Sequence, residues 1–317
     1  MSNPTEASRS ERRMLVIFPG ALGDLICAGP ALRALGRMNP DAAVDLMARA
    51  ELADLAAGRM GVERGYSIDR REVSAMFRED GTGDPAARKF FGRFARIWSF
   101  FAFDAPIYCR TLSQVSGGPV TFHQFRPSGA GHISDLYLKA IGAQDLPRAP
   151  RIDLTIDDLE AASEAMVSLN LTPDKFLMIF PGSGSANKNW DEKRFARLAL
   201  EIEDRMRLRP LAVLGPAEND LKPLFRDFQI ATISMPPLAS VAALAQSAAG
   251  FVGNDSGVSH LAAAAGARGV VIFGPSDPAR WRPLGRVTVM RASALEALTV
   301  EQVARPLEDA LRSIDPG

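Results

Sequence analysis

Short apolar runs alternate with longer segments of helical period along most of the chain. Strands are predicted at residues 14–18, 42–48, 176–180, 211–215, 250–254 and 269–274. Helical segments separate them, and in the first of these, 24–38, Pro30 either kinks the helix or opens its second part. Buried strands separated by helices are typical of a parallel sheet covered on both faces, so the pattern predicts an α/β fold.

The chain is long enough for two compact domains. It has 317 residues, about twice the common domain size. A polar, proline-bearing stretch at 142–158 interrupts the pattern, so we expect one domain at 1–150 and a second at 151–317. The last helix of the chain is a candidate for packing back on the first domain.

A short internal echo indicates two similar halves. The segment VIFPG at 16–20 returns as MIFPG at 178–182, and each places a Pro-Gly turn directly after a predicted strand. Ligands of open α/β sheets gather beyond the carboxyl ends of the strands. We therefore expect two Rossmann-like domains whose parallel sheets face a central cleft, with these turns as candidate walls.

Composition narrows the class of protein. Hydrophobic residues make up 47% and charged residues 23%, as in soluble globular proteins. Lys plus Arg and Asp plus Glu both number 37, which does not favour a nucleic-acid partner. The two isolated cysteines, Cys27 and Cys109, indicate a reduced cytoplasmic setting.

The start of the chain resembles a signal peptide only in part. Residues 9–35 run from basic to apolar, like a signal peptide, but Asp24 and three glycines interrupt the apolar part. No apolar run reaches the length of a membrane span. We expect a cytoplasmic protein, with the inner face of the inner membrane as an additional location.

The segment GNDSGVSH at 253–260 places polar residues before an alanine-rich helix. Residues 255–257 would form the strand-to-helix turn, whose free N–H groups attract anions. Ser256 and the Gly257 amide are therefore candidates for binding a phosphate. The Asp255 carboxylate suits sugar hydroxyls better. The alternative is that Asp255 or Ser256 is only an N-cap and that His260 is an ordinary core histidine.

Two further turns carry candidate binding residues. The glycine-rich turn PGSGSANK ends in Lys188, whose point charge suits a diphosphate; the alternative is a solvated surface lysine. Glu218 lies in LGPAEND after another predicted strand and could accept hydrogen bonds from a ribose or a base. The alternative is an exposed loop glutamate.

Asp24 is the one acid at the end of a predicted strand in the first domain. A desolvated carboxylate there could act as a general base on an attacking hydroxyl. The alternative is that Asp24 only caps the following helix.

Several motifs are absent from the sequence. There is no DxD carboxylate pair, and His123, His132 and His260 are widely spaced, so no metal site is expected. Neither GxGxxG, GxSxG nor the Walker pattern occurs, which argues against nicotinamide, serine-hydrolase and ATPase chemistry. No cofactor is therefore expected.

Four blocks stand in order along the chain: LGDLICAGPALRAL at 22–35, FPGSGSANKNWDEKRFARLA at 180–199, LGPAEND at 214–220 and VGNDSGVSHLAAAAGARGVVIFGPSDPARWRP at 252–283. This ordered set resembles glycosyltransferase family nine, the heptosyltransferases of lipopolysaccharide core assembly. The resemblance implies a GT-B fold and an inverting, metal-independent transfer. For members of this family the expected reaction is the transfer of heptose from ADP-heptose to a glycolipid or saccharide acceptor of lipopolysaccharide or cell-envelope synthesis.

The resemblance also implies roles for individual residues. Asp24 would be the catalytic base, Lys188 would contact the diphosphate, Glu218 the nucleoside and Asp255 the sugar. The rest of the donor site would comprise Gly182, Ser183, Ser185, Asn254, Ser256, Gly257 and His260. Gly23 is assigned to the acceptor. Two alternatives stay open: a nucleotide-sugar epimerase of the same fold, and a non-catalytic protein that binds nucleotide sugars.

The chain departs from the family pattern at several positions. Phe18 stands where members usually carry a basic residue, six positions before the catalytic Asp, and Ser256 and Val258 replace a usual Thr and a frequent Pro. Residues 40–130, where acceptor choice should lie, align poorly.

Within that region, residues 87–101 predict one helix with an apolar stripe and a basic stripe. A core helix is favoured, and contact of residues 87–103 with an anionic membrane is the alternative.

Overall fold

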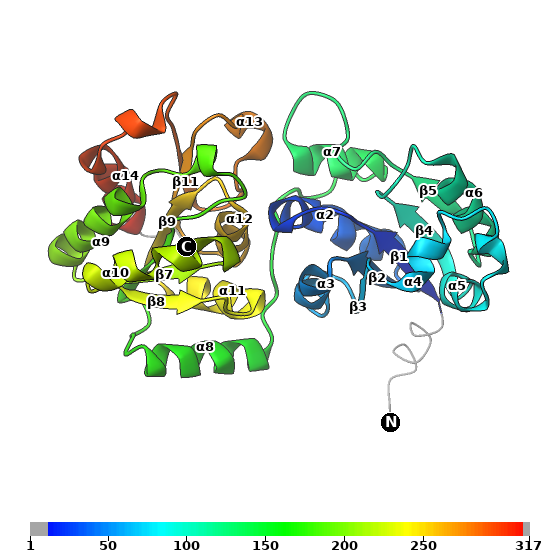
Figure 1. The fold of residues 1–317 in the computed structure, drawn as a ribbon, viewed down its shortest axis with the longest axis horizontal. Coiled ribbons are helices and arrows are strands. Elements are labelled where there is room, and N and C mark those ends of the chain that lie inside the picture. The colour runs from blue at the N-terminus through cyan, green and yellow to red at the C-terminus, as the bar shows by residue number, and fades with distance from the viewer. Residues whose placement is uncertain (1–11, 313–317) are drawn as a thin grey trace. The chain divides into compact units, whose positions relative to one another are not determined.

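The computed structural model describes residues 12–312, so the first three residues of the signal-like segment 9–35 lie outside the described part. The chain divides into two compact units, Met1–Arg148 and Ala149–Gly317 (Figure 1). Each unit is built around one parallel sheet. None of the described helices is both long enough and apolar enough to cross a membrane.

The first unit contains a five-stranded parallel sheet in the order β3-β2-β1-β4-β5. Its strands are β1 (Arg13–Ile17), β2 (Ala43–Ala48), β3 (Arg64–Ser67), β4 (Phe94–Ser99) and β5 (Val120–Phe122). Its helices are α2 (Leu22–Met38), α3 (Ala50–Ala56), α4 (Arg71–Ala75), η1 (Gly81–Gly83), α5 (Pro85–Phe91), α6 (Pro106–Val115) and α7 (Ile133–Ala140). Pro30 lies inside α2, which continues through it to Met38.

The second unit contains a six-stranded parallel sheet in the order β11-β10-β9-β6-β7-β8. Its strands are β6 (Phe176–Phe180), β7 (Arg209–Leu214), β8 (Ala231–Ser234), β9 (Gly250–Asn254), β10 (Gly269–Phe273) and β11 (Val287–Arg291). Its helices are α8 (Ile156–Ser168), η2 (Ala186–Lys188), α9 (Glu192–Met206), η3 (Pro216–Leu221), α10 (Lys222–Asp227), α11 (Leu238–Ser247), α12 (Gly257–Ala264), α13 (Pro278–Trp281), η4 (Leu295–Ala297) and α14 (Val300–Arg312).

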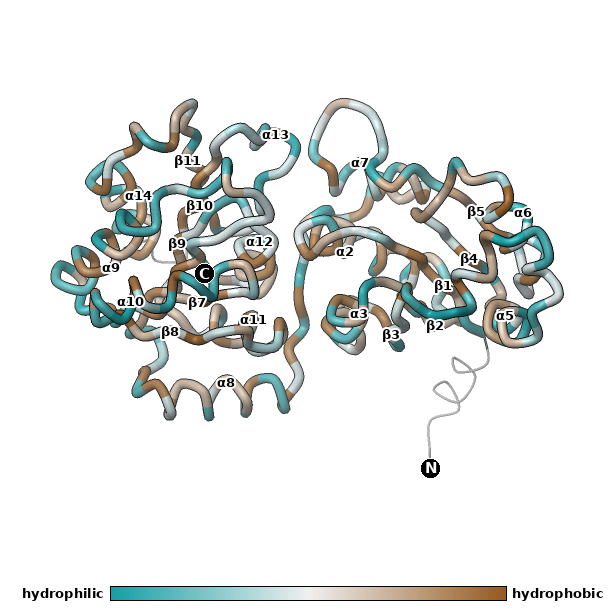
Figure 2. The backbone as a smooth tube through the Cα atoms, in the orientation of Figure 1, coloured by the Kyte–Doolittle hydropathy of each residue, from teal (hydrophilic) through white to brown (hydrophobic). Residues whose placement is uncertain are grey.

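Both faces of the second sheet are covered by helices. Leu177 and Ile179 of β6 join the core formed with α9 and α14, and the buried residues between them point to the other face. The helix α9 shows hydrophobic and hydrophilic positions in turn along its length (Figure 2), because one of its faces is buried and the other is exposed. The helix α14 packs on α9 and on β10 within this unit.

All six strands predicted from the apolar runs are present, and the predicted α/β architecture with parallel sheets is confirmed. The prediction of one helix over 87–101 is wrong. The helix α5 ends at Phe91, and residues 94–99 form β4, which pairs with β1 and β5. The buried residues Phe94, Ile97 and Trp98 of β4 lie on both faces of the strand, so its apolar positions do not alternate strictly and resemble a helical stripe.

The basic residues of this segment stack on aromatic rings. The Arg93 guanidinium lies 4.3 Å from the centroid of the Phe90 ring, and that of Arg96 lies 4.6 Å from the Trp98 ring. Because α5 and β4 replace the single amphipathic helix, the membrane contact inferred from that helix loses its basis.

Candidate functional site

Asn254 ties three segments of the second unit together. It is the last residue of β9, and its side chain is 0% exposed. Its amide donates a hydrogen bond to the Pro181 carbonyl oxygen at 2.7 Å, and its side-chain oxygen accepts one from the Trp190 N–H at 2.9 Å. The turn after β6 and the segment before α9 are thereby fixed against the end of β9.

Ser256 is the N-cap of α12, as the capping alternative predicted. Its hydroxyl oxygen accepts a hydrogen bond from the Ser259 N–H at 3.4 Å and lies 3.1 Å from the Ser259 hydroxyl oxygen. The Ser259 hydroxyl donates to the Asn254 carbonyl oxygen at 2.7 Å. Gly257 is then the first residue of α12, and His260 on the same helix is buried.

Lys188 and Asp255 form an ion pair beside this helix start. The Lys188 Nζ atom lies 2.8 Å from Oδ2 of Asp255. The Asp255 side chain is 7% exposed and that of Lys188 is 33% exposed. A mostly buried carboxylate therefore meets a partly exposed ammonium close to the amides that begin α12.

Glu218 lies against the turn after β6. Its carboxylate accepts a hydrogen bond from the Gly215 N–H at 3.0 Å. A Cβ atom on Gly182 would lie only 2.0 Å from Oε1 of Glu218, so the bare glycine is what lets the two segments meet. Ser183 and Ser185 shape the same turn, because the Ser183 hydroxyl donates to the Ser185 carbonyl oxygen at 2.8 Å.

These contacts bring most of the predicted donor residues together at one edge of the second sheet. The strands β6, β7 and β9 are neighbours, and all three are followed at their carboxyl ends by predicted residues. Carboxyl ends of adjacent parallel strands meet at the same edge, where ligands of such sheets bind. The edge combines a helix start and one ammonium with two carboxylates, which suits a ligand with both phosphates and hydroxyls.

Asp24 lies in the first turn of α2 in the first unit, directly after Gly23. Its carboxylate accepts a hydrogen bond from the Ala21 N–H at 3.3 Å. Asp24 therefore caps the start of α2, whether or not it also has a role in catalysis. Arg126 donates two further hydrogen bonds to it, one to each carboxylate oxygen, both at 3.0 Å. The Asp24 side chain is 5% exposed and that of Arg126 is 54% exposed. The hydrogen bond to Asp24 raises the pKa of Arg126 above its ordinary value.

Phe18 contributes an aromatic wall beside Asp24. Its ring lies 5.6 Å from that of Phe125, 5.7 Å from that of Tyr137 and 5.9 Å from that of Phe100. Arg126 follows Phe125 and is the basic residue that the structure brings to Asp24. Sequence reasoning missed it, because 102 positions separate the pair and no motif surrounds Arg126.

The histidines do not form a metal centre. His132 caps α7, its Nδ1 atom accepting a hydrogen bond from the Ser134 N–H at 3.2 Å, and His123 stacks on Phe100 with 4.9 Å between ring centroids. Within residues 12–312, the structure has no group of three or more His, Cys, Asp or Glu side chains that could hold a metal ion.

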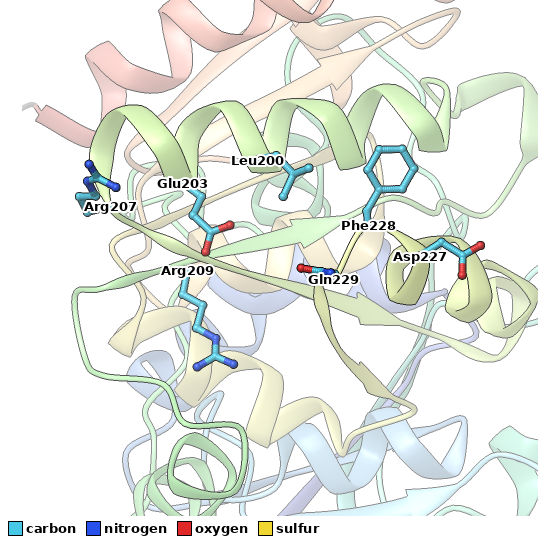
Figure 3. A pocket seen from close by; sticks show the side chains of 7 residues that line it. All are labelled: Leu200, Glu203, Arg207, Arg209, Asp227, Phe228 and Gln229. Atoms are coloured by element: carbon cyan, nitrogen blue, oxygen red, sulfur yellow. The ribbon is translucent and has the colours of Figure 1, made fainter.

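A surface hollow of about 760 Å³ lies at the other edge of the second sheet (Figure 3). It is lined by Leu200, Glu203, Arg207, Arg209, Asp227, Phe228 and Gln229. These residues come from the end of α9, the start of β7 and the end of α10. The hollow is therefore at the amino ends of the strands, and it contains none of the residues predicted for the site.

A sequence profile of glycosyltransferase family 9 (heptosyltransferase) matches residues 134–306, more than half of the chain. The two parallel α/β units and this match define the protein as a glycosyltransferase. The chain belongs to glycosyltransferase family 9, the heptosyltransferase family, as the four sequence blocks predicted. No curated protein sequence matches the chain.

Solved structures share the fold at low sequence identity. A family 9 glycosyltransferase from Veillonella parvula superposes with a TM-score of 0.80 at 18% identity, over 96% of this chain and 98% of that one. The ADP-heptose lipopolysaccharide heptosyltransferase II of E. coli gives 0.75 at 21% identity, over 94% and 98%. The E. coli heptosyltransferase WaaC with ADP gives 0.69 at 20% identity, over 94% and 99%. The GT-B class predicted from the sequence is thereby confirmed.

Proposed function

We propose that the protein is an inverting, metal-independent heptosyltransferase that uses ADP-heptose. Its acceptor would be a glycolipid or saccharide of lipopolysaccharide or cell-envelope synthesis. Membership of family 9 supports the reaction class, and the E. coli structures that share the fold are named for ADP-heptose or contain ADP. This acceptor class assigns the proposed reaction to the cytoplasm, at the inner face of the inner membrane.

The second unit would bind the donor. Lys188 and the first amides of α12 supply positive charge to the diphosphate, which gains negative charge as it leaves. Asp255 would accept hydrogen bonds from the sugar hydroxyls, and Glu218 from the nucleoside. Because protein groups supply this charge, the proposed leaving step needs no metal ion.

The first unit would supply the base. One oxygen of Asp24 takes the proton of the acceptor hydroxyl while that hydroxyl oxygen bonds to the anomeric carbon. The bond from the anomeric carbon to the diphosphate oxygen breaks, and its electron pair leaves with ADP. A single displacement of this kind inverts the configuration at the anomeric carbon.

One observation carries the proposal: the Lys188–Asp255 pair at the start of α12. It joins two sequence blocks that are 67 positions apart, and it does so at the strand edge where ligands of parallel sheets bind. A helix start with only a capping role would not require an ammonium and a carboxylate beside it.

The direct test is an assay of transfer from ADP-heptose to lipopolysaccharide purified from a heptose-free bacterial strain. The wild type should form product, and Asp24→Asn should reduce turnover by about 10²- to 10⁴-fold, the usual contribution of a general base. Calorimetry should find the affinity for ADP unchanged in Asp24→Asn. A fully active Asp24→Asn enzyme would refute the base assignment, and conversion of the donor without any acceptor would indicate an epimerase instead.

A further inference from the structure

Two of the three carboxylates to which the proposed reaction assigns a role form an ion pair with a basic side chain. Asp255 pairs with Lys188 in the second unit, and Asp24 pairs with Arg126 in the first. In each pair the carboxylate is nearly inaccessible and its partner is much more exposed. The Lys188 ammonium has a second proposed role at the diphosphate, but nothing so far accounts for Arg126.

The bonds to Arg126 conflict with the proposed work of Asp24. A general base needs a carboxylate oxygen within hydrogen-bond reach of the proton that it accepts. Each oxygen of Asp24 already accepts a hydrogen bond from Arg126, and Oδ2 also accepts one from the Ala21 N–H. A guanidinium bonded to both oxygens therefore occupies the positions at which Asp24 would accept a proton.

We propose that Arg126 is a guard on Asp24, which keeps the base from activating water until an acceptor is bound. In the resting chain Arg126 occupies both carboxylate oxygens. The acceptor hydroxyl displaces it from one oxygen and thereby gains a base. This inference rests on the proposed function, in which Asp24 is that base.

The surroundings of Arg126 fit a side chain that can leave its partner. The preceding residue, Phe125, is anchored by its ring against Phe18, and the His123 N–H donates to the Ser99 carbonyl oxygen at 2.8 Å. The Arg126 side chain is more than half exposed, and its guanidinium lies 5.2 Å from the centroid of the Phe125 ring, so it has an aromatic face to rest on beside the carboxylate. The backbone can therefore stay in place while the guanidinium moves.

The guard has a chemical consequence for the donor. Without it, a water molecule could give its proton to Asp24 and bond to the anomeric carbon, while the bond to the diphosphate oxygen breaks and ADP leaves with the electron pair. That reaction would waste the donor as free heptose. A residue that only oriented Asp24 would support attack by water and attack by the acceptor equally.

The test measures release of heptose from ADP-heptose without an acceptor. The wild type should hydrolyse the donor slowly, and Arg126→Gln should raise the rate by about 10-fold while its affinity for ADP is unchanged. The double variant Asp24→Asn/Arg126→Gln should lose the gain. Arg110→Gln is the matched control, because it removes a guanidinium from an exposed pair with Glu79 and should leave hydrolysis at the wild-type rate.

Unchanged or slower hydrolysis in a folded Arg126→Gln enzyme would overturn the guard, and so would a gain that survives in the double variant. A second measurement needs no donor: carbodiimide coupling of glycine ethyl ester to Asp24, followed by mass spectrometry. Labelling should be about 10-fold faster in Arg126→Gln, and equal labelling overturns the guard. Faster labelling in a chain that transfers nothing would refute the proposed function and would show only that Arg126 covers the Asp24 carboxylate.

Discussion

The ammonium group of Lys188 lies 2.8 Å from the carboxylate of Asp255, although 67 positions separate the two residues. In the proposed reaction the two groups act on different parts of the donor, the diphosphate and the sugar. Donor binding then exchanges one internal ion pair for two contacts with the ligand. Each group depends on the other until the donor arrives, because a buried carboxylate without a partner is costly.

Replacing Lys188 by Met should weaken both binding and turnover. The leaving diphosphate loses its ammonium, which should lower kcat by about 10²- to 10³-fold, the range seen when one group that stabilises developing charge is removed. Steady-state kinetics with ADP-heptose and calorimetry with ADP measure the two effects. Lys175→Met, which removes an exposed lysine at the start of β6, should behave like the wild type. Equal kinetics in the two variants would contradict the diphosphate role.

Asn254→Ala should destabilise the second unit. It should also loosen the edge of the second sheet that carries the proposed donor residues, the donor edge. The substitution leaves the Pro181 carbonyl oxygen and the Trp190 N–H without their partner, in a region where both residues are buried. Each unsatisfied buried group costs about 1–3 kcal/mol, so the loss in free energy of unfolding for the two groups should be about 2–6 kcal/mol. Urea denaturation measures the loss, and calorimetry should find weaker ADP binding at a temperature where the variant is folded. A variant as stable as the wild type would show that water replaces both bonds.

Gly182→Ala should impair the donor site without unfolding the chain. The added Cβ would lie 2.0 Å from Oε1 of Glu218, so the carboxylate must move from its bond with Gly215. The KM for the donor should rise by about 10-fold, as expected for the loss of one good hydrogen bond to a charged group. Gly184→Ala is the matched control in the same turn, because a Cβ there would meet nothing within 4 Å. An equal response of the two variants would exclude a nucleoside role for Glu218.

The donor edge of the second unit was the most predictable part of the molecule. Its strands are short apolar runs followed by Pro-Gly, Gly-Pro and Asp-Ser segments, and each of these carries its candidate residues within a few positions of the strand end. Strand, turn and helix start are therefore encoded in one continuous stretch. That is why β6 and β9 were predicted with their observed bounds.

The first unit was less predictable for two physical reasons. The strand β4 lies between β1 and β5, and its buried residues Phe94 and Ile97 point to opposite faces, so its apolar positions do not show the strict alternation of a strand with one buried face. The short strands β3 and β5 have few residues to form a pattern, and they were not predicted. The Asp24–Arg126 pair depends on a tertiary contact between distant segments, which no local spacing encodes.

Asp45→Asn should destabilise the first unit strongly. Asp45 is fully buried on β2 and accepts hydrogen bonds from Arg13 and from the Tyr66 hydroxyl, while Arg13 also bonds Glu63. Breaking a buried ion pair leaves the other charge unpaired and costs about 3–5 kcal/mol. Urea denaturation should show this loss. Asp80→Asn, whose partner Arg78 is exposed, should leave the denaturation curve unchanged, and a similarly small effect of Asp45→Asn would contradict the assignment.

The stability of the first unit should fall in mildly acidic solution through His123. Its ring stacks on Phe100, its Nε2 atom is buried without a hydrogen-bond partner, and burial lowers its pKa below the ordinary value. The unfolded chain then binds a proton more readily than the folded one, so stability rises with pH through this window. The contribution is complete above the unfolded pKa of about 6.5 and is lost progressively as the pH falls below it.

His123→Phe should remove this dependence, because phenylalanine can keep the stack on Phe100 and has no group to protonate. Thermal unfolding between about pH 7.5 and pH 5.5, a range that spans the ordinary histidine pKa, measures the slope for the wild type and the variant. The two proteins should have similar midpoints at the upper end, and the wild type should lose more stability toward the lower end. Parallel slopes would mean that the proton binds elsewhere, and a wild type that becomes more stable in acid would reverse the sign of the argument.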